Sequence, residues 1–221
     1  MATEGPRGVR TETQLMRLLH EAGVRNTTSV SGPWTPLSLR NSVPYMYLTI
    51  LSDINEENVR KVREAGSRLG IYGPGETRFE RGFWFWRTGA LVCSEEGGVA
   101  LYGNPFDPLD GSRYHDWGDV YPSPEGPAPS LHTLGKRAGI TDARYLFQLE
   151  HLIAEADRRG SPQAKEAAAK AQAMLGEIHD GIQLDISYYR MVAEEPPDDV
   201  LDYLRGRVGE QIATLGSLLG H

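Results

Sequence analysis

The sequence has one cysteine, Cys93, among its 221 residues. A single thiol cannot form a disulfide within the chain, and it excludes a zinc site built from several thiolates. Nothing in the residues around Cys93 predicts an activated nucleophile. We therefore expect a small thiol that is buried or half-buried.

Long apolar segments and an excess of basic charge are also lacking. Every apolar run is interrupted before the roughly 18 residues that a membrane span requires, so no membrane partner is expected. The first residues, MATEGPRGVRTETQ, contain no apolar core of a signal peptide, which favours a cytoplasmic location if Met1 is the true start. The net charge is −7 with both signs interspersed, which disfavours nucleic acid and fits a neutral ligand.

Aromatic residues are abundant in one part of the chain. Ten of the nineteen lie between Phe79 and Tyr121, among glycine, proline, asparagine and aspartate. Rings beside carboxylates and amides suit a sugar-binding cleft, because sugar faces stack on the rings and hydroxyls bind short polar side chains. The same composition also fits a core helix followed by a loop braced by Tyr and Trp.

Helix and strand patterns alternate along the first hundred residues, which predicts parallel β/α units. The predicted elements are a helix at 11–22 opened by a capping box of Thr11 and Gln14, a strand at 24–30, a strand at 45–51, a helix at 55–69 ended by Gly70, a short strand at 71–72, a helix or strand at 78–88, and a strand at 98–102.

The second half of the chain is predicted to be helical after a long loop. The loop runs from 104 to 130, and a loop of this length is usually functional. Helices are predicted at 141–159, at 163–179 after the cap Ser161-Pro162, and from Asp198 onward. We expect Arg137, Asp142 and Arg144 to form an ion-pair network with a structural role, fixing the first of these helices on the preceding part of the fold.

Three segments resemble a known family: RFERGFWFWRTGA, DVYPSPEGPAPSLHTLGKRAGITDARYLFQLEHLI and DISYYRMVAEEPPDDVLDYLRGRVGEQIATL. They are similar to the C-terminal half of DUF4091 proteins, which are related to the catalytic domain of glycoside hydrolase family 123. The resemblance implies an α/β fold with a partial (β/α)8 (TIM) barrel of about four β/α units, followed by an α-helical C-terminal tail. We expect the half barrel at residues 1–134 and the helical region, packing on it, at 135–221.

The resemblance also implies retaining hydrolysis of N-acetylhexosaminides, in which the substrate's acetamido group is the nucleophile. An adjacent Asp-Glu pair does this work in the family, the Glu as acid/base and the Asp as the group that orients the acetamido. No Asp-Glu dipeptide occurs in this sequence, and Glu4, the only candidate catalytic residue, follows Thr3. Thr133-Leu134 stands where the family usually has Trp-Glu. An incomplete or inactive chain is therefore expected.

A β/α barrel binds its ligand at the C-terminal ends of its strands. The expected substrate-binding residues at those ends are Trp34, Asp53, Tyr72, Tyr102, Asn104 and Asp107. Asp53 has a second interpretation as the cap of the helix at Asn55. No cofactor and no metal site is expected.

Two functions stay open at this point. The first is a glycoside hydrolase-like domain of N-acetylhexosaminidase type, and the second is a non-catalytic carbohydrate-binding or structural remnant. A carbohydrate is the expected ligand. The open edge of a half barrel also predicts self-association.

Overall fold

The computed structural model describes residues 6–24, 27–30, 45–48, 53–73, 75–94, 99–100, 117–121, 123–185 and 195–221. They form two compact units. The sheet unit comprises Met1–Pro74, Thr88–Glu96 and Leu184–Glu194, and the helical unit comprises Gly75–Arg87, Gly97–Gln183 and Glu195–His221. The predicted domain boundary between residues 134 and 135 falls inside a helix of the helical unit.

The sheet unit contains a four-stranded parallel sheet. Its strands are β1 (Thr27–Val30), β2 (Tyr45–Leu48), β3 (Arg68–Tyr72) and β4 (Val92–Ser94), and they pair in chain order. Thr27 pairs with Tyr45, Tyr45 with Arg68, and Gly70 with Val92. Leu48, Leu69 and Ile71 are buried. The parallel β/α pattern predicted from the sequence is confirmed for these strands.

Two helices of the sheet unit begin or end at residues other than those predicted. Helix α1 (Pro6–Glu21) starts before Thr11, so the predicted capping box of Thr11 and Gln14 lies inside the helix and is wrong as a helix start. Helix α3 (Glu56–Glu64) stops before Gly66, whose φ of 73° is left-handed. The predicted helix to Leu69, with Gly70 as its stop, is therefore wrong, because both residues belong to β3.

Residues 78–88, which the sequence left open, are helical. A helical turn at Arg78 and Phe79 continues into a π-helix, η4 (Glu80–Trp84), and then into α4 (Phe85–Thr88). Phe83 and Trp84 are almost fully buried. The FWFW block therefore supplies core side chains, as the blander interpretation of the aromatic segment predicted.

The predicted loop from Asn104 to Ser130 contains short strands where it is described. Strand β6 (Trp117–Gly118) pairs in antiparallel fashion with β5 (Val99–Ala100), which lies in the strand predicted at 98–102, and β7 (Val120–Tyr121) pairs in the same way with β8 (Ala128–Pro129). Gly126 has a φ of 116° in the turn between β7 and β8. Most of the remaining predicted loop lies outside the described residues.

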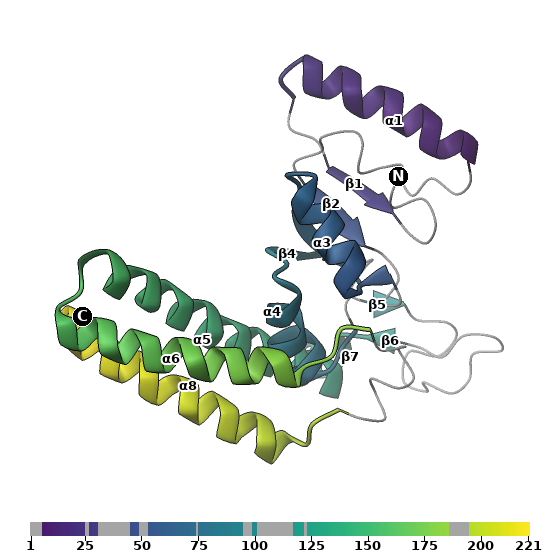
Figure 1. Ribbon diagram of the computed structural model, residues 1–221. Helices are drawn as coiled ribbons and strands as arrows, with labels where there is room; N and C mark the ends of the chain where they lie inside the picture. The colour runs from purple at the N-terminus through teal and green to yellow at the C-terminus, as the bar shows by residue number, and fades with distance from the viewer. Residues whose placement is uncertain are drawn as a thin grey trace. The chain divides into compact units, whose positions relative to one another are not determined.

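Three long helices dominate the helical unit, and Figure 1 shows them side by side. They are α5 (Leu131–Arg159), α6 (Pro162–Gly181) and α8 (Asp198–Leu219). The Ser161 side chain accepts a hydrogen bond from the Ala164 amide, which confirms the predicted cap of α6. Leu201, Val208 and Leu215 recur every seven residues and are buried, so they form an apolar face along α8.

Helix α5 begins ten residues earlier than predicted, with Ser130 as its cap. The added turns contain Gly135 and Gly139, which pack against the segment that leads into η4. A Cβ atom at Gly139 would lie 2.4 Å from the Arg78 carbonyl oxygen and 3.0 Å from the Gly82 amide nitrogen. The two helical segments therefore cross at a distance that only glycine permits.

The architecture as a whole is mixed α/β with a large share of helix. No helix in the described part of the chain is long and apolar enough to cross a membrane.

Candidate functional site

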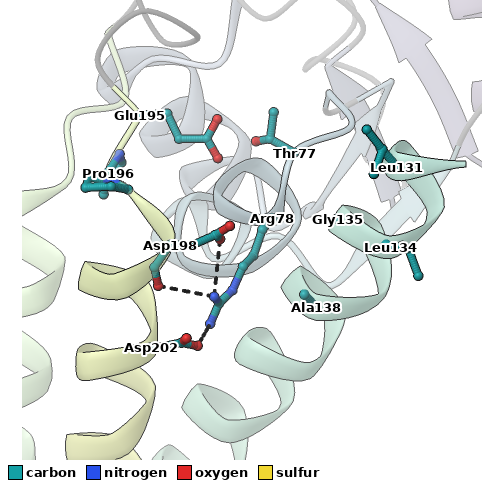
Figure 2. Close-up of a pocket in the computed structure, with 11 residues that line it drawn as sticks. Thr77, Arg78, Leu131, Leu134, Gly135, Ala138, Glu195, Pro196, Asp198 and Asp202 are labelled. Carbon is teal, nitrogen blue, oxygen red and sulfur yellow. Dashed lines mark hydrogen bonds and ion pairs between the residues drawn. The ribbon is translucent and has the colours of Figure 1, made fainter.

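A pocket of about 640 Å³ opens in the helical unit beside the start of η4 (Figure 2). It is bordered by the first turns of α5 and α8 and by the turn that precedes η4. Its lining residues are Thr77, Arg78, Leu131, Leu134, Gly135, Ala138, Glu195, Pro196, Pro197, Asp198 and Asp202. We refer to it as the Arg78 pocket.

The Arg78 guanidinium is the centre of this pocket. Its Nε donates to Oδ2 of Asp142 at 2.7 Å, and its Nη2 lies 2.9 Å from Oδ1 of Asp202. Its Nη1 lies 3.3 Å from Oδ1 of Asp198, and Figure 2 shows Asp198 and Asp202 turned toward it from α8. Arg205 joins the cluster by donating to Asp142 at 3.3 Å and to Asp202 at 2.8 Å.

Burial differs greatly among the acidic partners. The Asp142 side chain is fully buried, whereas 81% of the Asp198 side chain and 57% of the Asp202 side chain are exposed. Burial by itself disfavours the charged guanidinium, but hydrogen bonds and charges from Asp142 and Asp202 outweigh it and raise the pKa of Arg78. Arginine side chains stay protonated in proteins, so Arg78 contributes a positive charge to this cluster.

The turn before η4 is fixed by a reciprocal capping box. The Thr77 amide donates to Oε2 of Glu80 at 2.9 Å, and the Glu80 amide donates to Oγ1 of Thr77 at 3.2 Å. The amide of Phe79, which lies between them, donates to Oε1 of Glu195 at 3.2 Å. Two carboxylates and one hydroxyl thus satisfy three backbone donors at the start of this helical segment.

Glu80 is an unusual carboxylate because its exposed fraction is only 2%. Its Oε1 is buried without a hydrogen-bond partner in the described structure. Burial raises the pKa of Glu80, although hydrogen bonds from Thr77 oppose the change. Gly75, with a φ of 53°, lies against the carboxyl group, where a Cβ atom would be about 1.9 Å from Oε2.

The chemistry of the Arg78 pocket follows from these contacts. The donor groups of Arg78 already point at Asp142, Asp198 and Asp202, so the pocket offers carboxylate acceptors rather than donors. Such a surface can accept hydrogen bonds from the hydroxyl or amino groups of a ligand. Within the described residues no three His, Cys, Asp or Glu side chains are arranged to hold a metal ion.

The predicted ion-pair network of Arg137, Asp142 and Arg144 is wrong, because Asp142 has other partners. Asp142 pairs with Arg78 and Arg205 instead. Arg144 is two residues from Asp142 on one helix, and helical residues two apart do not face each other. The structural role that the sequence suggested for Asp142 agrees with its full burial.

Only two of the predicted site residues are described. Asp53 is buried after β2, and Tyr72 ends β3 and is half-buried. The cap of α3 is supplied by the side chain of Asn55, and Asp53 contributes its backbone carbonyl, which accepts from Nδ2 of Asn58 at 2.9 Å. Glu4, Trp34, Tyr102, Asn104 and Asp107 lie outside the described residues.

Sequence reasoning did not find the residues of the Arg78 pocket. The spacing of Thr77 and Glu80 is a capping-box signal that could have located the start of the helix. Asp198 and Asp202 carry no sequence signal beyond an acidic first turn of α8. Cys93 lies in β4 and is half-buried, as expected.

Comparison with known proteins adds no relative. No protein-family model matches the chain, and no curated protein matches it.

Proposed function

We propose that the chain is a glycoside hydrolase-like domain of N-acetylhexosaminidase type that binds a neutral carbohydrate. In this proposal β1 to β4 are consecutive units of a partial (β/α)8 barrel. The sequence resemblance to DUF4091 proteins and glycoside hydrolase family 123 supports it. The sheet supports it too, since four parallel strands that pair in chain order are what adjacent barrel units require.

One observation carries the proposal. Strands β2 and β3 are parallel neighbours, so their carboxyl ends lie at the same edge of the sheet. Asp53 follows β2 along the chain, and Tyr72 ends β3. A carboxylate and a phenol that follow neighbouring strands combine an acceptor for sugar hydroxyls with a ring for a sugar face. Barrel enzymes bind their substrates at this end of the strands.

Catalysis is not part of the proposal, because the sequence has no Asp-Glu dipeptide. In substrate-assisted hydrolysis the Glu of that pair transfers the proton and the Asp orients the acetamido group. General acid–base catalysis contributes on the order of 10² to 10⁴-fold, so its loss leaves binding without appreciable turnover. Glu4 is the residue to substitute first if turnover is found.

The alternative is a structural remnant that binds no sugar. The ion pairs of Arg78 favour this alternative. They connect the segment before η4 to Asp142 of α5 and to Asp198 and Asp202 of α8, so the buried charge of Arg78 is used within the fold. A buried ion-pair cluster of this kind serves the fold and needs no ligand. The alternative predicts neither turnover nor binding.

The experiment combines an activity assay with a binding assay on the 221-residue chain. We expect no turnover of an aryl N-acetylgalactosaminide and saturable binding of N-acetylgalactosamine by calorimetry. Tyr72→Leu should abolish that binding, whereas Tyr203→Leu, at an exposed position of α8, should leave it unchanged. Robust turnover contradicts the loss of catalysis, and the absence of both activities selects the structural remnant.

A further inference from the structure

A second pocket of the helical unit has the opposite charge character. It encloses about 480 Å³ between α5 and the segment that begins β7. Its lining includes three cationic side chains, Lys136, Arg137 and Arg144, and one carboxylate, Asp119. This excess of positive charge stands out in a chain whose net charge is −7.

The pocket is held in shape by hydrogen bonds at one end. The carbonyl oxygen of Asp119 accepts from the Ser130 amide at 3.0 Å and from the Thr133 hydroxyl. The Asp119 carboxylate binds Nζ of Lys136 at 2.6 Å, and Glu76 lies 3.6 Å from the same atom. The charge of Lys136 is therefore compensated within the protein.

The two arginines differ from Lys136 in this respect. Arg137 and Arg144 are exposed, and neither makes an ion pair or hydrogen bond through its side chain with the residues that the structure describes. They are seven residues apart on α5, which places them about two turns, or roughly 10 Å, apart along one helix face. Both guanidinium groups remain available to a ligand.

The remaining wall groups limit the kind of ligand. The Thr141 hydroxyl already donates to the Arg137 carbonyl at 2.9 Å, so its oxygen is left to accept a hydrogen bond. Ile140, 47% exposed, and Val120 add apolar surface. A matching ligand has an anionic group for the arginines, a hydroxyl for Thr141 and a carbon skeleton for the apolar wall.

We propose that this pocket binds a small, hydroxyl-bearing ester of phosphate or sulfate, whose tetrahedral oxyanion pairs with Arg137 and Arg144. Guanidinium groups bind such oxyanions with two parallel hydrogen bonds, which makes arginine well suited to them. The volume is in the range of about 300 to 1,000 Å³ that small-molecule sites have. The net charge of −7 disfavours a nucleic acid as the ligand. This proposal does not depend on the proposed carbohydrate function at the sheet edge.

The test is calorimetric titration of the 221-residue chain with glucose 6-phosphate, glucose 6-sulfate, inorganic phosphate and glucose. We expect saturable binding of glucose 6-phosphate that weakens as salt is added, weaker binding of inorganic phosphate, and binding of glucose that is weaker still and does not change with salt. Equal binding of the sulfate assigns the site to either ester, and preference for the phosphate assigns it to phosphate esters. Binding of glucose as tight as that of its phosphate, phosphate binding as tight as that of the ester, or no binding of either ester at millimolar concentration overturns the proposal.

Matched variants on one helix locate the site. Arg137→Gln and Arg144→Gln should each weaken glucose 6-phosphate binding by about tenfold or more, the usual effect of losing a charge-assisted hydrogen bond. Arg158→Gln removes an exposed arginine in the last turn of α5 and should leave the affinity unchanged. An equal loss in all three variants would indicate a general charge effect and would overturn the assignment, as would wild-type affinity in the double variant of Arg137 and Arg144.

Discussion

Arg78 and Asp142 form a buried ion pair between the start of η4 and the middle of α5, with Nε of Arg78 2.7 Å from Oδ2 of Asp142. The Asp142 side chain is fully buried, so its charge has no access to water. Arg205 donates to the same carboxylate from α8. Three separate helical segments therefore meet at one carboxylate.

Removing that carboxylate should be costly. We expect Asp142→Ala to lower the free energy of unfolding by about 3 to 5 kcal/mol, because Arg78 is left with an incompletely compensated charge in a buried position. Asp202→Ala removes an exposed partner of the same arginine and should cost less than about 1 kcal/mol. Urea denaturation of both variants makes the comparison. Equal losses in the two variants would contradict the central role of Asp142.

Glycine at position 139 is required by the crossing of α5 with η4. Gly139→Ala would bring a methyl group to 2.4 Å from the Arg78 carbonyl oxygen, and overpacking of this kind costs about 1 to 3 kcal/mol. Gly206→Ala is the matched control, because nothing lies within 4 Å of a Cβ atom there. The control should gain up to about 1 kcal/mol from better helix propensity. Thermal unfolding of the two variants should therefore shift in opposite directions, and a stabilised Gly139→Ala would refute the crossing.

Much of the helical unit is predictable because its signals are local. Ser161-Pro162 and the alanine-rich sequence after it define α6 without reference to any other segment, and Pro196-Pro197 marks the start of α8. The first turns of α5 are not predictable in this way. Gly135 and Gly139 disfavour helix in isolation, and they are explained by a contact with a segment about 60 residues earlier in the chain.

The ion pairs around Arg78 could not be predicted from the sequence for the same reason. Arg78 and Asp142 are 64 residues apart, and no spacing rule links them. The sequence instead suggested the nearby Arg137 and Arg144 as partners, although helical geometry turns Arg144 away from Asp142. Gly66 was a local signal for the end of α3, because glycine readily adopts the left-handed conformation seen there. The helix was nevertheless predicted to continue to Leu69, because apolar residues keep helical spacing up to that position.

The stability of the protein should depend on pH through Glu80. Burial raises the pKa of Glu80 in the folded state, so from about its ordinary value of 4.5 upward the folded protein holds a proton that the unfolded chain has lost. Rising pH therefore removes stability from the wild type through this group. Glu80→Gln has no such proton to lose, and its free energy of unfolding relative to wild type should increase as pH rises above that value.

Denaturant titrations at a series of pH values measure this difference. Glu125→Gln, which makes the same chemical change at an exposed carboxylate, is the control for the substitution itself. A difference for Glu80→Gln that is constant, or that falls as pH rises, would show that Glu80 is ionised in the folded protein.

The described sheet ends at β1 and β4, and under the proposed half barrel these edges lack neighbouring strands. Unpaired N–H and C=O groups at a sheet edge favour association with another chain. We expect light scattering to show dimers or larger species at micromolar concentration. A monodisperse monomer that unfolds cooperatively would mean that the fold closes on itself, and the half-barrel interpretation would then be wrong.

The proposed carbohydrate function is tested most directly by mapping amide chemical-shift changes as N-acetylgalactosamine is added to the 221-residue chain. We predict saturable shifts at Asp53, at Tyr72 and at their neighbours along the carboxyl edge of β2 and β3. The same titration with glycerol, a small polyol without a sugar ring, should leave these amides unchanged. Shifts confined to the helices after Thr141, or no shifts at all, would contradict the account.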